Sequence, residues 1–335
     1  MSKTVTKPLA LTMGDPAGVG PQITMAAWQQ LRDSPEHSFF VIGAPELYAP
    51  HMAVEVISHP DDASDIFRKA LPVLALANMP IPALGEPNAD TAPAIIAAIE
   101  TAVSLCLDGQ ADAIVTNPIN KALLYGAGFK HPGHTEFIAA LCASESEAPP
   151  QPVMLLTGGG LRVALATIHA PLREACDALT TPALVSLGEI VSTAMRQDFG
   201  IFDPQIAFTG LNPHAGEGGT IGREEIDIIN PAAEQLRAVG INMSDARSAD
   251  TVFAEALTGR FDAIIAMTHD QGLIPVKTLD FWGGVNSTLG LPIVRTSPDH
   301  GTGYDAAAQG NARPDSLIAA IKQARLMTDN RKRTA

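Results

Sequence analysis

Aromatic and basic residues are scarce in this chain, and their scarcity limits how the core can be packed and which partners the protein can bind. Only 5% of the 335 residues are aromatic, so small and branched aliphatic side chains must fill the large core that a 46% hydrophobic content allows. Lysine and arginine total 22 against 36 acidic residues, a formal net charge of −14. That charge argues against nucleic acid or an anionic membrane as the main partner. A small anionic substrate stays possible, because a few local cations can hold a phosphate.

Cysteine is also rare. Cys106, Cys142 and Cys176 are odd in number and lack CxxC spacing, which predicts reduced thiols in a cytoplasmic protein rather than a disulfide framework. We expect neither a signal peptide at the N-terminus nor an apolar run long enough to span a bilayer. The length allows two domains or one large one.

Three short apolar runs each end close to a histidine: residues 162–169, 206–214 and 263–269. Runs rich in valine, isoleucine and alanine are typical of buried parallel strands. Ligands of open α/β sheets bind beyond the carboxyl ends of such strands, so three imidazoles there could converge on one divalent cation. The alternative is three unrelated histidines at strand ends. The repetition of the pattern leaves the two interpretations about equal.

Other short apolar runs alternate with helical patterns, which is typical of an α/β fold. We expect strands at residues 9–13, 39–43 and 111–116, and a hairpin of strands 152–156 and 162–167 around three glycines at 158–160. We expect helices over residues 22–31, 91–107, 180–199, 223–239 and 250–257. The helix over 180–199 should be capped by Thr180 or Thr181.

A glycine-rich turn, Gly14 to Pro21, joins the first strand to the first helix. Such a turn suits close approach of the backbone to a ligand and anion binding at the helix start. It is neither a GxGxxG motif nor a P-loop. A tight turn with a purely structural role explains it at least as well.

Polar residues at helix starts are candidates for binding an anion. His134 and Thr135 precede a helix expected to begin near Glu136, where free backbone N–H groups favour negative charge. Alternatively, Thr135 only caps that helix. Lys121 opens another helix beside a strand end, and it fits a cleft residue and a surface residue equally well.

Beyond the third histidine lie Lys277, Asn286 and Arg295, in a segment broken by glycines and a proline. Two cations and an amide together suit a clamp for phosphate or carboxylate. Surface charge near a hairpin is the alternative.

Six motifs together resemble a known family, the 4-hydroxythreonine-4-phosphate dehydrogenases of pyridoxal-phosphate biosynthesis. They are Gly14 to Pro21, Asn117 to Lys121, Gly133 to Glu136, Leu211 to Glu217, His269-Asp270-Gln271-Gly272 and Asp299 to Asp305. The resemblance covers roughly residues 8 to 327. The Gly14 turn and the loop from His300 to Asp305 also resemble the wider isocitrate and isopropylmalate dehydrogenase fold.

The resemblance implies a two-domain α/β subunit with a cleft between the domains, assembled as a homodimer with shared active sites. Its sheets would be mixed but largely parallel, with helices on both faces. The outer, NAD-binding domain would comprise residues 1–131 and 297–335. The central domain, residues 132–296, would hold the metal, the substrate and the dimer contacts.

The resemblance also assigns site residues. It implies that His169, His214 and His269 bind one divalent cation, with ligands shared between subunits. It implies that the phosphorylated substrate is bound by His134, Thr135, Lys277, Asn286 and Arg295. It implies that the adenine end of NAD or NADP is bound by His300, Gly301, Asp305 and Asn311. Isocitrate relatives hold Mg²⁺ or Mn²⁺ with carboxylates, whereas imidazoles tolerate Zn²⁺, Co²⁺ or Ni²⁺, so the metal (zinc, cobalt, magnesium or similar) stays open.

The implied reaction is oxidation of 4-phosphooxy-L-threonine (4-hydroxythreonine 4-phosphate) by NAD(P)⁺ to a β-keto acid that decarboxylates to 3-amino-2-oxopropyl phosphate. Lys277, Asp270 and Asp250 are candidates for proton transfer, with no favourite among them. Relatives within the family act instead on 4-phosphothreonate or on an aromatic cis-dihydrodiol dicarboxylate. More distant alternatives are a metal-dependent hydrolase that needs no NAD and a noncatalytic metal-binding protein.

Overall fold

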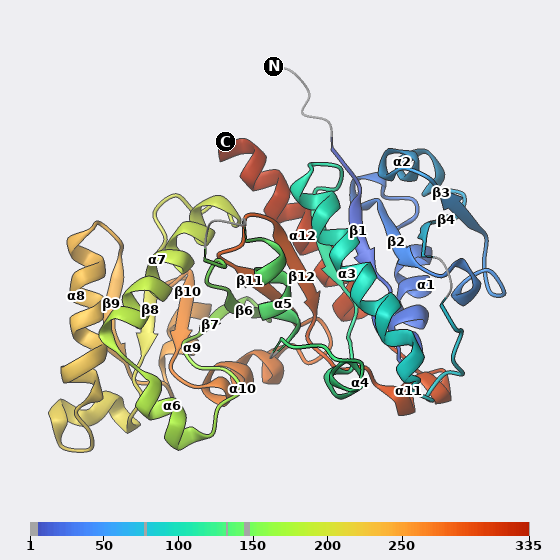
Figure 1. The fold of residues 1–335 in the computed structure, drawn as a ribbon. Helices are drawn as coiled ribbons and strands as arrows, with labels where there is room; N and C mark the ends of the chain where they lie inside the picture. The colour runs from blue at the N-terminus through green and yellow to red at the C-terminus, as the bar shows by residue number, and fades with distance from the viewer. Residues whose placement is uncertain (1–5, 77–78, 132, 144–147, 335) are drawn as a thin grey trace. The chain divides into compact units, whose positions relative to one another are not determined.

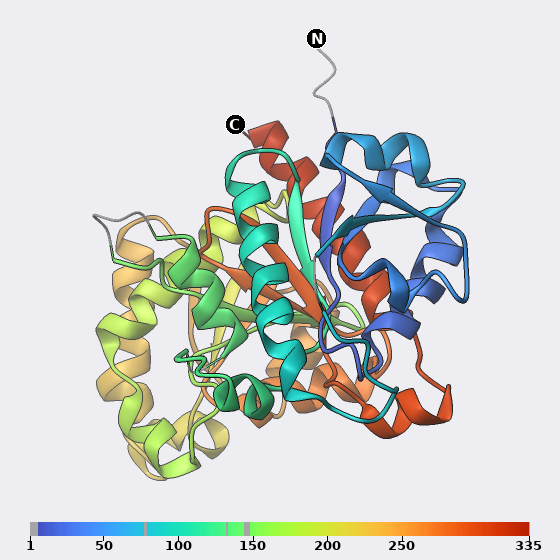
Figure 2. The same ribbon diagram turned by 45° about the vertical axis from the view of Figure 1, so that its right-hand side comes forward.

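Alternating strands and helices form two units in the computed structural model, which describes residues 6–76, 79–131, 133–143 and 148–334 (Figures 1 and 2). Unit 1 comprises Met1–Pro152 and Leu291–Lys332, and unit 2 comprises Val153–Gly290 and Arg333–Ala335. Residues 1–5, on which the expected lack of a signal peptide partly depends, lie outside the described residues. An α/β fold with largely parallel strands is confirmed.

Unit 1 contains six parallel strands in the order β3-β4-β2-β1-β5-β12. They are β1 (Leu9–Thr12), β2 (Phe39–Gly43), β3 (Val54–Ile57), β4 (Leu71–Ala75), β5 (Ala113–Thr116) and β12 (Val294–Pro298). Every residue of β1, β2, β5 and β12 is buried, as expected for parallel strands covered on both faces.

The helices of unit 1 are α1 (Gly20–Leu31), α2 (Ala63–Ile66), α3 (Ala92–Leu107), α4 (Lys121–Gly126), α5 (His134–Leu141), α11 (Tyr304–Gln309) and α12 (Asp315–Thr334). Helix α3 contacts β1, β2 and β5, and in both views it runs in front of the strands while α12 runs behind them. The segment Ala89–Leu107 is long and apolar enough to cross a membrane by length and composition, contrary to our expectation from the sequence. Its apolar face is buried against the sheet, so we interpret it as a core helix.

Unit 2 contains strands in the order β11-β6-β7-β10-β8-β9. They are β6 (Val153–Gly158), β7 (Leu161–Leu165), β8 (Ile206–Thr209), β9 (Met243–Arg247), β10 (Ala263–Ala266) and β11 (Val285–Leu289). The expected hairpin is confirmed, because β6 and β7 pair antiparallel and Gly159 and Gly160 turn between them with φ of 57° and 88°. Strands β7, β10, β8 and β9 are parallel.

The helices of unit 2 are α6 (Leu172–Ala178), α7 (Thr181–Gln197), α8 (Asn230–Ala238), α9 (Val252–Leu257) and α10 (His269–Leu279). The cap expected at the start of α7 is confirmed, since Thr180 Oγ1 accepts a hydrogen bond from Ala183 N at 3.3 Å. The single helix expected over residues 223–239 is instead a π-helix, η6 (Glu225–Ile229), that continues into α8.

No helix was expected at α10, which contains two poor helix formers, Gly272 and Pro275. Gly272 is nevertheless required there, since a Cβ at this position would lie 2.5 Å from the Leu165 side chain of β7. The glycine lets α10 pack closely on β7, and burial of Leu273 and Val276 against the sheet outweighs its poor helix propensity.

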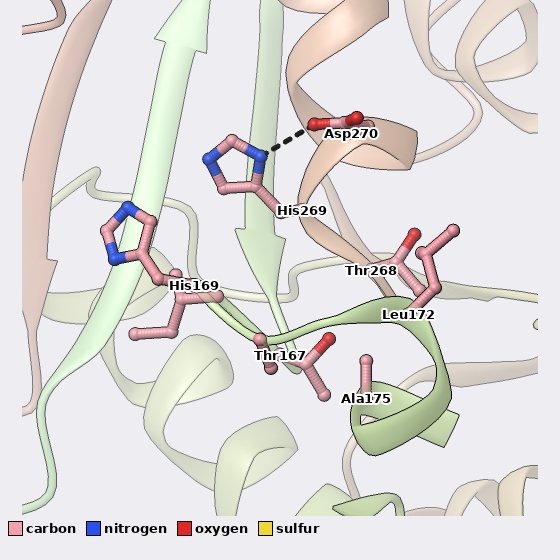
Figure 3. A pocket seen from close by; sticks show the side chains of 9 residues that line it. Thr167, His169, Leu172, Ala175, Thr268, His269 and Asp270 are labelled. Carbon is pink, nitrogen blue, oxygen red and sulfur yellow. Dashed lines mark hydrogen bonds and ion pairs between the residues drawn. The ribbon is translucent and has the colours of Figure 1, made fainter.

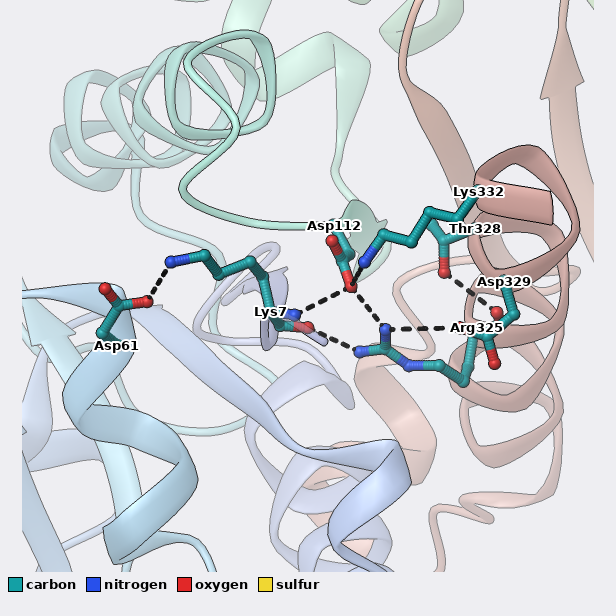
Figure 4. A network of polar contacts seen from close by, with 7 residues as sticks. All are labelled: Lys7, Asp61, Asp112, Arg325, Thr328, Asp329 and Lys332. Carbon is teal, nitrogen blue, oxygen red and sulfur yellow. Dashed lines mark hydrogen bonds and ion pairs between the residues drawn. The ribbon is translucent and has the colours of Figure 1, made fainter. Parts of the chain in front are cut away.

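A buried carboxylate, Asp112, ties three parts of unit 1 together where β5 begins (Figure 4). A single oxygen of Asp112 accepts hydrogen bonds from Lys7 N at 3.0 Å, Arg325 Nη1 at 2.6 Å and Lys332 Nζ at 2.7 Å. The side chains of Asp112 and Arg325 are only 7% and 4% exposed. The C-terminal helix α12 is thereby fastened to the segment that precedes β1.

Asp112→Ala should lower the free energy of unfolding by about 3–5 kcal/mol, because it removes the 2.6 Å ion pair of the buried Arg325 guanidinium and leaves only the more exposed Asp329 carboxylate 4.0 Å away. Urea denaturation monitored by circular dichroism would measure the loss. Asp61→Asn is the matched control, since Asp61 pairs with Lys7 in a much more exposed position and its loss should change stability far less. Equal losses in the two variants would contradict the argument from burial.

Candidate metal and substrate site

The three strands that end near histidines are neighbours in one sheet. Strand β10 lies between β7 and β8 and pairs in parallel with both, with Ile264 opposite Val163 on one side and Ala207 on the other. Their carboxyl ends therefore lie at one edge of unit 2. His169, His214 and His269 follow these ends by four, five and three residues.

His169 and His269 face each other at this edge (Figure 3). Their ring centroids are 5.5 Å apart, and both rings line a pocket of about 200 Å³ together with Thr167, Ile168, Ala170, Leu172, Ala175, Thr268 and Asp270. His269 Nδ1 lies 2.8 Å from Asp270 Oδ1. When Nδ1 carries the proton and donates it to this carboxylate, Nε2 offers its lone pair to a cation, as in many metal sites.

His214 does not complete a three-ligand cluster in the single chain. Within residues 6–76, 79–131, 133–143 and 148–334, no three histidine, cysteine or acidic side chains come close enough together to hold a metal ion. An electrostatic partner of His214 within the chain is Asp250, which lies two residues before α9. The pKa of Asp250 is lowered, chiefly by the Ser248 hydroxyl 2.5 Å away, and His214 adds a smaller electrostatic effect.

A buried arginine forms the centre of a polar cluster in unit 1. Arg295, on β12, is 4% exposed, and its Nε and Nη2 donate to Thr116 Oγ1 at the end of β5 at 3.2 and 2.8 Å. Burial lowers the pKa of Arg295 to about 10, and the Glu136 carboxylate partly opposes that shift. The guanidinium is therefore charged at neutral pH and suits an anion.

His134 begins helix α5 beside this arginine. The cap is Gly133, with no side-chain hydrogen bond, so His134 and Thr135 lie within the helix and not before it, and the alternative interpretation of Thr135 as the cap is wrong. Burial, and then the nearby charges of Arg295 and Lys121, hold the pKa of His134 well below its usual value, so its ring is neutral. In the described part of the chain its buried Nε2 has no hydrogen-bond partner, which leaves it for a ligand.

Lys121 belongs to the same cluster. It is the first residue of α4, which Asn120 caps by accepting from Ala122 N and Leu123 N. A Cβ built on Gly133 would lie 3.2 Å from Lys121 Nζ and 2.6 Å from Glu136 Oε2. The lysine therefore lies beside the uncapped start of α5, but its side chain is exposed, so the structure agrees with both the cleft and the surface interpretation drawn from the sequence.

The other two expected substrate residues lie in unit 2. Lys277, on α10, is half-buried, with its Nζ 5.9 Å from the centre of the Phe281 ring. Asn286 is the second residue of β11 and is also half-buried. The five predicted substrate residues thus divide into His134, Thr135 and Arg295 in unit 1 and Lys277 and Asn286 in unit 2.

The glycine-rich turn after β1 is packed against the chain itself. A Cβ on Gly14 would lie 2.6 Å from the Asn117 Cβ, and one on Gly18 would lie 2.6 Å from the Thr302 carbonyl oxygen. Asp15, 1% exposed, accepts hydrogen bonds from Tyr304 Oη at 2.5 Å and Ala17 N at 3.0 Å. These contacts support the interpretation of the turn as a structural feature. The hydrogen bond between Asp15 and Tyr304 was not predicted from any sequence motif.

The expected cofactor residues surround the short helix α11. His300 is exposed, with its Nδ1 3.0 Å from the Gly301 carbonyl oxygen, and Asp305 is in the first turn of the helix. Asn311 follows the helix and donates to Gln309 Oε1 at 3.0 Å. Among the described residues, nothing lies within 4 Å of a Cβ built on Gly301, so its surroundings are open.

Comparison with known proteins gives one consistent result. A 4-hydroxythreonine-4-phosphate dehydrogenase from Caulobacter vibrioides is 53% identical over 324 residues, 95% of this chain and 97% of that protein. The crystal structure of a 4-hydroxythreonine-4-phosphate dehydrogenase from Klebsiella pneumoniae superposes with a TM-score of 0.84 at 35% identity, covering 96% of this chain and all of that one. A terephthalate 1,2-cis-dihydrodiol dehydrogenase from Burkholderia xenovorans gives 0.66 at 27%, with 96% and 98% covered.

The family model described as pyridoxal phosphate biosynthetic protein PdxA matches residues 36–324. The resemblance drawn from the six motifs is thereby confirmed. On these grounds, the chain belongs to the PdxA family of pyridoxal phosphate biosynthetic proteins.

Proposed function

We propose that this chain oxidises 4-phosphooxy-L-threonine with NAD⁺ or NADP⁺ and releases 3-amino-2-oxopropyl phosphate after decarboxylation, in pyridoxal 5'-phosphate biosynthesis. The observation that carries the proposal is the pairing of His169 and His269 beyond adjacent parallel strands, in a chain whose relatives over nearly its full length bear that activity in their names. The unpaired cysteines support a cytoplasmic location for the enzyme.

His169, His214 and His269 would hold the divalent cation, and neutral imidazoles suit zinc or cobalt well, with magnesium also possible. When bound, the cation would act as a Lewis acid that stabilises negative charge developing on the substrate oxygen. Because, in the described part of one chain, His169 pairs with His269 and His214 does not join them, we propose that a homodimer completes the ligand set. Exposed apolar side chains on and near α10 support such an interface: Ile274 is 63% exposed, Phe281 65% and Trp282 51%.

The polar side chains would bind and orient the substrate. Arg295, charged at neutral pH, and Lys277 would neutralise its phosphate and carboxylate. The neutral His134 and the Thr135 hydroxyl would bind at the uncapped start of α5, where free N–H groups add to the attraction for an anion. Asn286 would supply an amide whose donor and acceptor orient the substrate's polar groups.

Among the three candidates for proton transfer, we favour Lys277. Asp270 already contacts the His269 ring and so serves to orient it. The lowered pKa of Asp250 makes that carboxylate a weaker base. Lys277 is half-buried, on the same helix that begins at His269. NAD(P) would bind at His300, Gly301, Asp305 and Asn311, where the surroundings of Gly301 are open enough for close approach.

Purified enzyme given 4-phosphooxy-L-threonine and NAD⁺ or NADP⁺ should produce NADH or NADPH, seen by absorbance at ~340 nm. Chelator treatment should abolish the signal and added Zn²⁺ or Co²⁺ restore it, because the cation supplies several kcal/mol of stabilisation to the reaction. Parallel assays with 4-phosphothreonate and with a cis-dihydrodiol dicarboxylate test the alternative substrates, the latter favoured by the structural likeness to the terephthalate enzyme. Faster turnover of either one would replace the proposed substrate.

A further inference from the structure

His214 lies in an unusual left-handed turn. Six consecutive residues from His214 to Gly219 have positive φ, with values of 53°, 51°, 74°, 44°, 66° and 92°. Three of them, His214, Ala215 and Glu217, are not glycine. L residues avoid this region because Cβ approaches the following carbonyl oxygen, and a run of them is rarer than a single one. Such a conformation persists only where neighbouring groups hold it in place.

A buried carboxylate, Glu225, holds the strand side of this turn. The residue is 2% exposed. Its Oε1 accepts hydrogen bonds from the backbone N–H groups of Leu211 at 2.8 Å and Asn212 at 2.7 Å. Its Oε2 accepts a third from Asn212 Nδ2 at 3.0 Å. Three donors on one carboxylate fix the segment between β8 and His214, and hydrogen bonds to a charged acceptor are the strong ones.

The same carboxylate also contacts the far side of the turn. A Cβ on Gly216 would lie 2.5 Å from Glu225 Oε2, and one on Gly210 would lie 3.2 Å from Oε1. The two glycines therefore let the backbone close around the carboxylate from both sides of His214. No larger residue fits at Gly216, where φ is 74° as well.

Glu225 reaches this place from the first residue of the π-helix η6. π-helical turns are uncommon and often occur at functional sites. Its neighbour Glu224 strengthens the attachment, since Glu224 Oε2 accepts from Asn212 Nδ2 at 2.7 Å and from Arg223 N at 3.0 Å. The start of the helix that leads into α8 is therefore joined to the His214 turn by several hydrogen bonds.

We propose that Glu225 is the positioning residue for His214: its carboxylate fixes the left-handed turn, so that the imidazole is already placed for the divalent cation before the cation binds. This inference rests on the proposed function of His214 as a ligand. A ligand that is ordered on folding loses less conformational entropy when the metal arrives, and supporting groups of this kind strengthen metal binding.

Glu225→Gln tests the proposal with little change in shape. Oε1 can still accept from the two backbone N–H groups, but the new amide nitrogen sets a donor against Asn212 Nδ2. Isothermal titration of the full-length, metal-free protein with Co²⁺ should show binding weakened about 10–100-fold. The visible spectrum at saturating Co²⁺ should also change, because it reports ligand geometry and a purely structural role would leave it unaltered.

Two comparisons complete the experiment. Asp227→Asn makes the same carboxylate-to-amide change two residues along η6, where Asp227 pairs with Arg223 in an exposed position, and Co²⁺ binding should match wild type. Gly216→Ala leaves the Glu225 carboxylate chemically unchanged but places a Cβ 2.5 Å from its Oε2, so it should disturb the contact between carboxylate and turn and weaken binding similarly. This second variant keeps the test decisive if Glu225→Gln fails to fold. Hydrogen exchange at Leu211 and Asn212 should be faster in the metal-free Glu225→Gln protein.

Each outcome decides one question. Wild-type affinity and spectrum in a folded Glu225→Gln or Gly216→Ala protein, beside lost binding in His214→Ala, would overturn this inference and leave the proposed function standing. Failure of the wild-type protein to bind Co²⁺ would overturn both. Weakened binding in Glu225→Gln and Gly216→Ala with normal binding in Asp227→Asn would support the role of Glu225.

Discussion

His214→Ala should lose bound divalent cation and turnover together. With one of three imidazoles gone, we expect metal content after dialysis to fall to near zero and kcat for NADH formation to fall roughly a thousandfold, since the Lewis acid contributes about 4 kcal/mol or more. Metal content by atomic emission and the absorbance assay measure the two effects. The result is expected even though His214 stands apart from the His169–His269 pair in a single chain, because the homodimer is proposed to complete the site.

The matched control is His51→Ala, which removes an exposed imidazole of unit 1 and should change neither quantity. Excess Co²⁺ should restore part of the activity of His214→Ala if two ligands still hold the cation weakly. Full turnover in His214→Ala without metal would contradict the assignment of the three histidines and would favour a reaction that relies on the cofactor and the basic side chains alone.

The strand ends were predictable because a strand buried on both faces appears in the sequence as an unbroken run of apolar residues. Residues 263–266 and 206–209 are short, unbroken apolar runs, and they form the parallel strands β10 and β8. The order of the strands in the sheet cannot be predicted from such runs. Strand β10, last of the histidine strands in the chain, lies between β7 and β8, and the histidine that follows it pairs with the one that follows β7.

The supports of the site were not predictable for a related reason. In the sequence, Glu225 is one of several acidic residues at the start of a helix. The structure shows that three N–H groups donate hydrogen bonds to its carboxylate. Asp15 and Tyr304 are 289 residues apart in sequence and share a hydrogen bond. The close packing of α10 on β7 likewise depends on a residue of another element, since a Cβ on Gly272 would lie 2.5 Å from the Leu165 side chain. Long-range polar contacts depend on tertiary structure, which local patterns do not encode.

Arg295→Lys should raise KM for the phosphorylated substrate about 10–100-fold and change kcat less. Lysine keeps the charge but loses the planar fork that binds Thr116 and is proposed to bind an anion at the same time. A hydrogen bond to a charged group contributes about 1.5–3 kcal/mol. Burial lowers the pKa of Arg295 to about 10, so its charge is fully present at pH 7 and is lost only as the pH rises through 10. The KM ratio between variant and wild type should therefore stay constant from about pH 6 to 8.

Arg325→Lys separates binding from stability in this test. Arg325 is also buried, but it pairs with Asp112, which immediately precedes β5, whereas Arg295 contacts Thr116 at the other end of that strand. Steady-state kinetics and urea denaturation should show a stability loss with unchanged KM for Arg325→Lys, and the raised KM for Arg295→Lys. A raised KM in both variants would mean that the substrate effect arises from general loosening of unit 1. An unchanged KM in Arg295→Lys would mean that Arg295 only stabilises β5 and does not bind the substrate. Anion binding would then depend on His134, Lys121 and the start of α5.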